Sequence, residues 1–247
     1  MDATTKRTVL AVVAATGVGV VAFLTGGIMT ALAAVALYDG PAVSKISIEW
    51  VLITMLAQNG GMLAVGVIYL NSKEWSLSDL RIKRPSRVDG LWSVVGLGLL
   101  FVGLVGTTFL LEQLGLPLSE HSILNVAEDN PDVLLLLIPL SLLLVGPIEE
   151  LVYRGVIHTR LKDELGVSVT IGIAAVIFAI VHFPAYYAGT GGEAVISSLV
   201  VIFALGSLLG VLYEYSGNLL VPIVVHGGYN AANFGLKYLE FTGGLPG

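Results

Sequence analysis

The sequence predicts an all-α integral membrane protein, a polytopic bundle of about seven, and at most eight, transmembrane helices. Of its 247 residues, 55% are hydrophobic and only 12% are charged, whereas soluble domains carry about 25% charged residues. The apolar runs are long enough for membrane helices and too long for the strands of a membrane barrel. Open sheets cannot span lipid, because their edges leave backbone groups without hydrogen bonds.

Each predicted span is a mostly apolar run of roughly the 20 residues that cross a bilayer. The first run is long enough to tilt, or to break at Gly26-Gly27. The predicted spans are 8–38, 50–72, 91–111, 133–161, 166–183, 194–213 and 215–236. They divide the chain into an N-terminal group of three helices in residues 1–132, a helical core in 133–236 and a short C-terminal tail, 237–247.

Basic residues predict the orientation of the bundle, because cytoplasmic loops are enriched in Lys and Arg. The segment 73–89 holds five of them, whereas 115–132 holds four acidic residues and no Lys or Arg. The pair Lys6-Arg7 and the turn around Arg160 fall on the same side as 73–89. We therefore expect a multi-pass cell-membrane protein with a cytoplasmic N-terminus, in which the basic segment 73–89 also contacts anionic lipid headgroups.

The composition excludes several classes of function. The chain has no cysteine, which excludes disulfides, thiolate catalysis and thiolate metal sites. Its formal net charge of −6 argues against nucleic-acid binding. The uncharged run 8–38 is too long for the apolar core of a cleaved signal peptide, so it is predicted to be a membrane span.

Two adjacent carboxylates, Glu149 and Glu150, follow sixteen uncharged residues within a predicted span. A charged side chain at membrane depth costs about 2.5–3.5 kcal/mol on insertion scales, so such groups persist when they pair or do chemistry. Glu150 and Arg154 are four residues apart and can form an ion pair on one helix face. Glu149 points about 100° away from that face, so it needs a different partner.

Two histidines in later spans are the candidate partners of Glu149. With a helical turn near 163–166, Glu149 and His182 lie at similar depth in antiparallel neighbours, at about 1.5 Å per residue. His226 follows the turn at Gly217 by only about eight residues, so its nominal depth is shallower. Either that turn is sunk into the bundle or the helices are strongly tilted.

These residue types permit two kinds of hydrolysis. Glu149 with His182 could hold and deprotonate a water molecule, while His226 and Asn230, which share a helix face, could donate hydrogen bonds to the oxyanion. Alternatively, Glu149, His182 and His226 match a catalytic zinc site of the His₂Glu type. The helical His-Glu-x-x-His zinc motif is absent.

The segment 133–236 resembles the CPBP family, which comprises CAAX prenyl proteases of type 2, bacteriocin-processing proteins and abortive-infection-like membrane proteins. Three motifs in the family's order carry the resemblance: Glu149-Glu150-x-x-x-Arg154, Phe178-x-x-x-His182 and His226-x-x-x-Asn230. Any one of them is weak alone, but three in order within apolar helices are specific. The first three spans carry no recognisable motif.

The resemblance implies an intramembrane endopeptidase that hydrolyses a peptide bond near the membrane interface, in peptides or lipidated proteins that include C-terminally prenylated ones. The resemblance implies that Glu149 and His182 activate water and that His226 and Asn230 form the oxyanion site. It also implies that Glu150 and Arg154 support these catalytic residues. Members are described both as metalloproteases and as glutamate-dependent. We favour activation by glutamate with no required cofactor and keep zinc as an alternative.

Two other classes of function are consistent with the same residues. Buried Glu and His also form proton relays in proton- or ion-coupled transporters, although such transporters usually have internal repeats and none is visible. The second alternative class is a non-catalytic membrane scaffold or immunity protein. Outside the motifs, we expect His121 and His158 to be solvated surface groups, whereas Tyr153 could reach the site.

Overall fold

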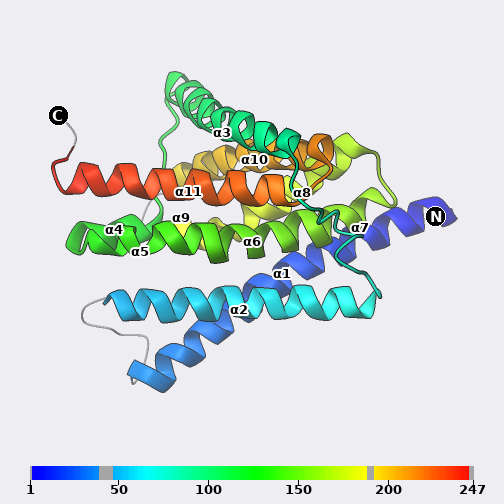
Figure 1. The fold of residues 1–247 in the computed structure, drawn as a ribbon, viewed down its shortest axis with the longest axis horizontal. Helices are drawn as coiled ribbons and strands as arrows, with labels where there is room; N and C mark the ends of the chain where they lie inside the picture. Colours follow the sequence, from blue (N-terminus) through cyan, green and yellow to red (C-terminus); the bar gives the residue numbers. More distant parts are fainter. Residues whose placement is uncertain (1, 39–46, 188–191, 245–247) are drawn as a thin grey trace.

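The computed structural model describes residues 2–38, 47–187 and 192–244, and every regular element in these ranges is a helix (Figure 1). In chain order they are α1 (Ala3–Tyr38), α2 (Ile48–Ser72), α3 (Arg87–Gln113), α4 (Ser122–Asp129), α5 (Asp132–Leu140), η1 (Ser141–Val145), α6 (Gly146–Glu150), η2 (Leu151–His158), α7 (Thr159–Lys162), α8 (Val167–Val181), α9 (Phe183–Tyr186), α10 (Gly192–Ser216) and α11 (Leu220–Phe241). The predicted all-α class is confirmed, and α11 continues into the predicted tail.

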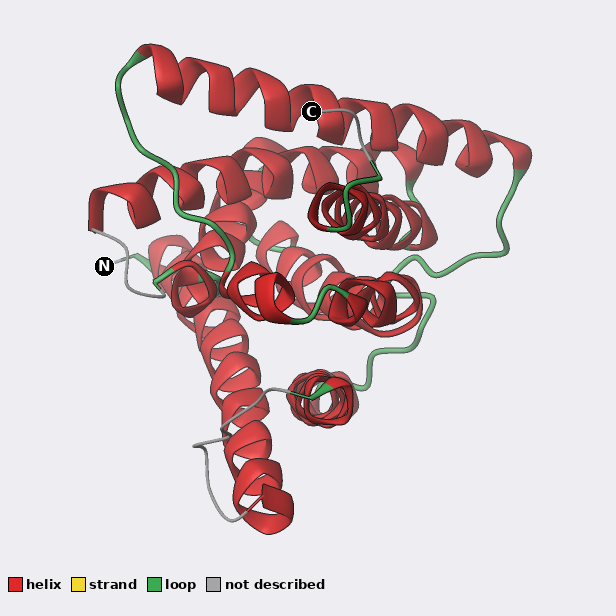
Figure 2. Cartoon of the chain, turned by 90° about the vertical axis from the view of Figure 1, so that its left-hand side faces the viewer, coloured by secondary structure: helices red, strands yellow, loops and turns green. Residues whose placement is uncertain are grey.

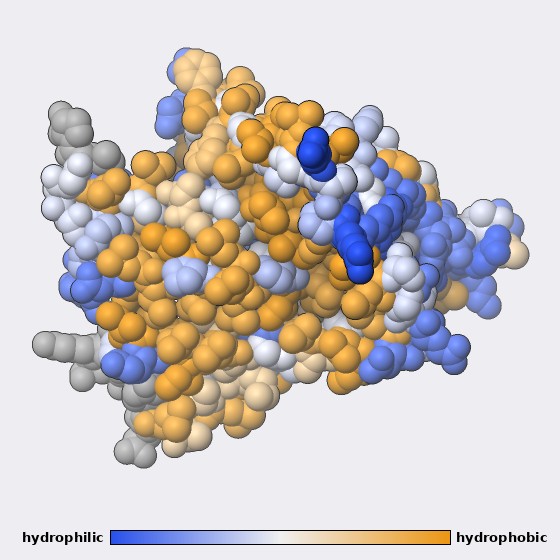
Figure 3. Space-filling view, viewed as in Figure 1, coloured by the Kyte–Doolittle hydropathy of each residue, from blue (hydrophilic) through white to orange (hydrophobic). Residues whose placement is uncertain are grey.

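Five helical stretches in the described part of the chain are long and apolar enough to cross a membrane: 3–37, 48–72, 87–113, 132–162 and 192–216. The 15 residues of α8 and the 22 residues of α11 occupy the two remaining predicted spans. Figure 3 shows an apolar band between two more hydrophilic ends. The chain is therefore a polytopic helical membrane protein.

Of the two alternatives predicted for the long first run, a tilt or a break at Gly26-Gly27, the break does not occur, because α1 is continuous. The glycine instead allows α1 and α2 to cross closely: a Cβ atom on Gly26 would lie 2.6 Å from the backbone oxygen of Gln58, and one on Gly61 would lie 2.8 Å from the Cα of Gly26. Small residues at helix crossings let two backbones approach in this way. Figure 2 shows the result, with α1 running diagonally past α2, which is seen end-on.

The central helical stretch, 132–162, is continuous but contains two π-helical segments, η1 and η2. Pro139 and Pro147 each lack a backbone N–H, which interrupts the regular hydrogen-bond ladder. A π-helical segment widens the turn and changes which side chains face the neighbouring helices, and such segments are frequent at functional sites. Glu149 and Glu150 lie between the two segments, where this local adjustment sets their directions.

The turn before α11 is buried beneath a distant segment of the chain. Asn218 and Leu219 are buried. The side chain of Asn218 accepts a hydrogen bond from the backbone N–H of Lys83 (3.3 Å), and the N–H of Leu219 donates to the carbonyl of Arg81 (3.2 Å). The basic segment 73–89 thus covers this turn, and α11 begins below the surface.

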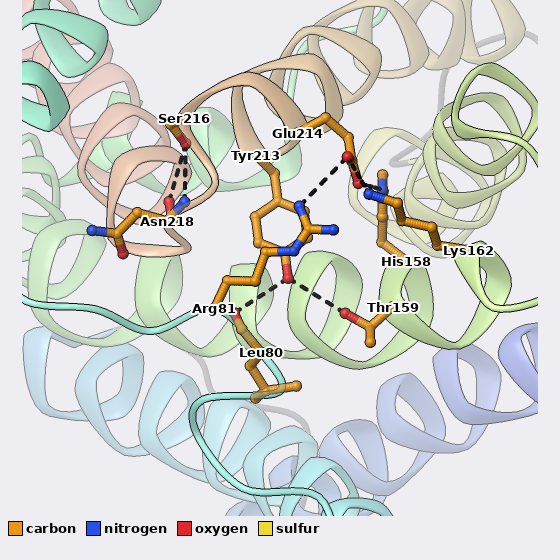
Figure 4. Close-up of polar contacts among 9 residues, drawn as sticks. All are labelled: Leu80, Arg81, His158, Thr159, Lys162, Tyr213, Glu214, Ser216 and Asn218. Carbon is orange, nitrogen blue, oxygen red and sulfur yellow. Dashed lines mark hydrogen bonds and ion pairs between the residues drawn. The ribbon is translucent and has the colours of Figure 1, made fainter.

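The prediction that His158 is solvated is wrong, because His158 belongs to a cluster of charged side chains around Glu214 (Figure 4). His158 is fully buried, because the end of η2 packs against α10 rather than facing water. Its Nε2 lies 2.9 Å from the carboxylate of Glu214, which also binds Lys162 and lies 3.4 Å from Arg81. The cluster connects α10, the central stretch and the basic segment 73–89.

Replacing Glu214 with glutamine is expected to lower the free energy of unfolding by about 1.5–3 kcal/mol, the usual value of hydrogen bonds to a charged group. Glu240→Gln is the matched control, because its ion pair with Lys237 (3.0 Å) is more than half exposed on the Glu side. Exposed pairs contribute less than about 1 kcal/mol. Denaturation in mixed micelles measures both variants, and equal effects would contradict a structural role for the buried cluster.

Candidate active site

A close approach of two helices builds the centre of the site. A Cβ atom on Gly146 would lie 3.0 Å from the Cα of Gly227, and one on Gly227 would lie 2.8 Å from the backbone oxygen of Ser141. Larger residues at either position would separate α11 from the central stretch. This close approach holds His226, which precedes Gly227, beside Glu149 and Glu150, which lie one helical turn after Gly146.

Glu149 lies between the two predicted histidines. Its Oε2 is 3.9 Å from the Nε2 of His182 and 4.0 Å from the Nε2 of His226. These separations exceed the 2.7–3.2 Å of a direct hydrogen bond and have the length that one bridging water spans. The neighbours of Glu149 are thus two histidines from other helices, whereas Glu150 pairs with Arg154 on its own helix, as the sequence predicted.

Glu150 and Arg154 form the predicted ion pair, with 2.8 Å between Arg154 Nη1 and Glu150 Oε1. Both side chains are almost completely buried. Arg154 Nη2 also donates to the carbonyl of Gly206 on α10 (2.9 Å), and Glu150 Oε1 accepts from His226 Nδ1 (2.8 Å). The pair therefore connects three helices and fixes the orientation of the His226 ring.

Phe178 packs at the centre of the polar groups. Its ring centroid lies 4.5 Å from that of His182 and 5.9 Å from that of His226, and the Arg154 guanidinium lies 4.6 Å from it. A cation over an aromatic face gains electrostatic stabilisation, more so away from water. The phenylalanine of the second motif thus supports both the histidines and the arginine.

A single cavity of about 510 Å³ contains the candidate residues. Glu149, His182 and His226 line it, together with Asn230, one helical turn after His226. Tyr153 also lines it, as predicted from its position four residues after Glu149. Most of the remaining lining is apolar and comes from several helices, for example Phe23, Met62, Leu104, Leu137, Val201 and Phe234. The four predicted catalytic side chains thus share one apolar cavity.

The prediction that His121 is a solvated surface group is wrong. His121 lines the cavity near α4, where its ring contacts Tyr186, and its Nδ1 accepts a hydrogen bond from the N–H of Ile123 (3.1 Å). Burial, with a smaller effect of the nearby His182, lowers the pKa of His121 to about 4. The ring is therefore neutral at physiological pH and can cap the start of α4.

Sequence reasoning missed the contribution of α2 to the cavity. Gln58 and Asn59 line it as polar residues within an otherwise apolar helix. The carbonyl of Gly206, which binds Arg154, was also missed, because a backbone acceptor leaves no signal in the sequence. The one available signal for α2 was the polar pair itself, which stands in the uncharged run 50–72.

Within the described ranges, no group of three or more His, Cys, Asp or Glu side chains has the geometry of a metal site. The predicted zinc ligands Glu149, His182 and His226 are near one another, but the His nitrogens lie 3.9 and 4.0 Å from the carboxylate oxygen. Tetrahedral ligands at 2.0–2.1 Å from zinc would be closer together, at about 3.3 Å. The present arrangement therefore does not fit the metal, and zinc stays a prediction for experiment.

The fold and the site define a class: a polytopic helical membrane protein with buried glutamates and histidines at an apolar cavity. A family model described as "Type II CAAX prenyl endopeptidase Rce1-like" matches residues 131–232. Residues 131–232 therefore match an Rce1-like domain, in agreement with the resemblance of this part of the chain to the CPBP family. No curated protein and no solved structure matches the chain.

Proposed function

We propose that the protein is an intramembrane endopeptidase that hydrolyses a peptide bond with a water molecule activated by Glu149. The observation that carries this proposal is the position of the Glu149 carboxylate, which lies within 4.0 Å of two imidazole nitrogens at an apolar cavity. The match of residues 131–232 to the type II CAAX prenyl endopeptidase family model supports the same reaction class. Glycine, proline and π-helical features around the carboxylates hold this geometry in place.

His182 has one ring nitrogen free to bind water. Its Nδ1 lies 2.7 Å from the carbonyl oxygen of Phe178, and because a carbonyl only accepts, Nδ1 carries a proton in this contact. In neutral His182 the Nε2 is then an acceptor. A single water molecule between them donates one hydrogen bond to Glu149 and a second one to His182. These two bonds direct a lone pair of the water oxygen at the substrate carbonyl.

Hydrolysis then proceeds in two proton transfers. The water oxygen attacks the carbonyl carbon while one of its protons moves to Glu149, which acts as general base. When the carbon–nitrogen bond breaks, Glu149 returns this proton to the leaving amine. The products are a carboxylic acid and an amine, and the side chain regains its initial charge.

His226 and Asn230 are proposed to stabilise the oxyanion. His226 Nδ1 faces Glu150, so a protonated His226 would present its Nε2–H to the cavity. With that proton, the charges of Glu149, Glu150, Arg154 and His226 sum to zero, a combination that a low-dielectric site tolerates best. Fixed donors at a developing negative charge are often the largest single contribution to such reactions. Glu150 and Arg154 position the donor.

The proposed substrate is a peptide or a lipidated protein whose cleavage site reaches the cavity from the membrane interface. The apolar lining could accommodate a lipid group or apolar side chains, and the family name points to C-terminally prenylated proteins. The cavity residues alone are compatible with unlipidated apolar segments too. A panel of substrates is therefore needed to separate the two.

The deciding experiment is incubation of the purified protein in detergent with farnesylated, geranylgeranylated and unlipidated peptides, with and without a chelator. We expect cleavage of at least one peptide class, unchanged by the chelator. Cleavage that is lost with the chelator and restored by zinc would replace water activation by glutamate with a zinc mechanism. An inert protein across the panel would contradict the peptidase proposal.

A further inference from the structure

We propose that Lys237 binds the C-terminal carboxylate of the substrate peptide and so selects peptides in which the cleaved bond lies close to a free C-terminus. This inference rests on the proposed peptidase function, and it names a residue that recognises the substrate away from the reacting groups. It follows from the row of polar side chains that α11 presents to the cavity and from the charge at the end of that row.

The face of α11 toward the cavity carries a row of polar side chains. Its members follow one another at intervals of four, three and four residues, which places them on one side of a helix. They all line the cavity and are, in order, His226, Asn230, Asn233 and Lys237. The first two are the proposed oxyanion donors. The row therefore leads from the reacting groups to Lys237, and a peptide bound along it meets the lysine last.

Lys237 lies near the end of the bundle that α11 shares with α4 and α5 (Figure 1). The aromatic rings of Phe234 and Phe241 on α11 pack against the apolar cluster around Leu137 of α5. This packing fixes the last turns of α11 against the wall of the cavity. The lysine is therefore held at one end of the same cavity that contains the candidate active site.

Lys237 is the cation of the cavity. Among the described residues that line it, and apart from its histidines, Glu149 and Lys237 carry the only charged side chains. The Lys237 side chain is 32% exposed, so it is accessible to a ligand, whereas most of the lining around it is apolar. Charges interact more strongly beside apolar groups than in bulk water, because the local dielectric constant is lower. An anionic group of the substrate thus finds its partner at this position.

The present partners of Lys237 leave room for a further anion. Its Nζ lies 3.0 Å from a carboxylate oxygen of Glu240 and 4.0 Å from one of Glu120. The first separation is that of a hydrogen bond and the second is longer, while an ammonium group has three N–H donors. Both acids are more than half exposed, and exposed ion pairs contribute little to stability. A substrate carboxylate can therefore join Glu240 at the ammonium group and take the place of Glu120.

The two acids also determine which anions bind. Together they carry more negative charge than the lysine balances, so an anion that diffuses freely gains little at this position. A carboxylate that belongs to a peptide already held in the cavity is present at a high effective concentration. Lys237 therefore recognises the end of a bound peptide rather than a free carboxylate.

The length of the row relates the carboxylate to the cleaved bond. Lys237 follows Asn230 by seven residues, a rise of about 10 Å along the helix. An extended peptide covers this distance with about three residues. A longer extension carries its carboxylate beyond Lys237, and an amidated C-terminus has no carboxylate. Both changes to the peptide therefore remove the same interaction.

Three versions of one cleaved peptide test this interaction: the free acid, the C-terminal amide and the free acid extended by four alanines. In the parent protein, kcat/KM for the free acid is expected to exceed the other two values by about tenfold or more, the effect of a hydrogen bond between charged groups. The difference should fall with added salt. Lys237→Gln should lower kcat/KM for the free acid to the value of the amide, and the losses from variant and amide should not add.

Glu240→Gln is the matched control, because it removes the same 3.0 Å ion pair and leaves the ammonium group in place. It should keep the preference for the free acid or increase it. Lys83→Gln, at an exposed position outside the cavity lining, should keep the preference too, and Lys237→Arg should retain part of it. Equal losses for the acid and the amide in Lys237→Gln would show a structural role and overturn the inference.

Binding without cleavage separates this inference from the proposed reaction. In a Glu149→Gln background, a fluorescent free-acid peptide is expected to bind about tenfold more tightly than its amide, and Lys237→Gln should remove the difference. Equal binding of acid and amide would overturn the role of Lys237, and the peptidase function would stand if the parent protein cleaves both. A parent protein that cleaves neither, yet distinguishes them through Lys237, would contradict the peptidase function alone.

An anionic lipid headgroup is another source of negative charge for this lysine. Addition of phosphatidylglycerol to the detergent micelles is expected to leave the preference for the free acid unchanged. Loss of the preference with phosphatidylglycerol, but not with the zwitterionic phosphatidylcholine, would assign Lys237 to a lipid headgroup. That result would overturn its role in recognition of the peptide terminus.

Discussion

Replacement of Glu149 with glutamine is expected to lower kcat for peptide hydrolysis by about 10²- to 10⁴-fold, the contribution typical of a general base. Glutamine keeps the size of the side chain but cannot take a proton from water. The fold should persist, because Glu149 Oε2 has no hydrogen-bond partner among the described residues and its histidine neighbours lie 3.9 and 4.0 Å away.

The matched control for this prediction is Glu193→Gln, a change of the same kind at an exposed position at the start of α10. It should retain full activity, and both variants should unfold at the temperature of the parent protein. His182→Ala is expected to lose activity to a similar extent, because the water would lose its second acceptor. A Glu149→Gln protein that still cleaves at the parental rate would remove the proposed base.

The sequence was sufficient for the membrane fold because the same physical constraint acts on every span. Lipid offers no hydrogen bonds, so each apolar run must be helical, and the seven runs predicted the helices to within a few residues. Exceptions arose where packing rather than lipid decides. The glycine pair at Gly26 marks a helix crossing rather than a break, and the turn at Asn218 is buried because a distant basic segment covers it.

The site was predictable to the extent that its residues carry an unusual cost. Charges and histidines in apolar helices require partners, and this requirement alone linked Glu150 to Arg154 and directed attention to His182 and His226. The environments of His121 and His158 could not be predicted, because burial at a helix end depends on how neighbouring helices pack. Backbone acceptors such as Gly206 have no distinctive side chain at all.

Replacement of Arg154 with methionine is the change expected to affect stability most. The Glu150 carboxylate is fully buried, and its Oε2 already lacks a hydrogen-bond partner in the described part of the chain. Removal of Arg154 would leave it with His226 alone, and a buried charge that loses its partner costs about 3–5 kcal/mol. The contacts of the guanidinium with Phe178 and with the Gly206 carbonyl would also be lost.

A double variant separates the charge from the packing. Glu150→Gln/Arg154→Met removes both charges, so it should recover part of the stability that Arg154→Met loses, since an apolar replacement of a buried pair is often neutral. Arg160→Met, at a partly exposed position in the same helical stretch, should change unfolding in mixed micelles by less than about 1 kcal/mol. If instead the double variant is no more stable than Arg154→Met, the loss comes from packing around Phe178 and not from the unpaired carboxylate.

Activity gives the complementary measure, because Glu150 orients His226. The double variant should remain folded and still hydrolyse peptides more slowly than the parent. This result is expected for residues that position the catalytic groups rather than contact the substrate.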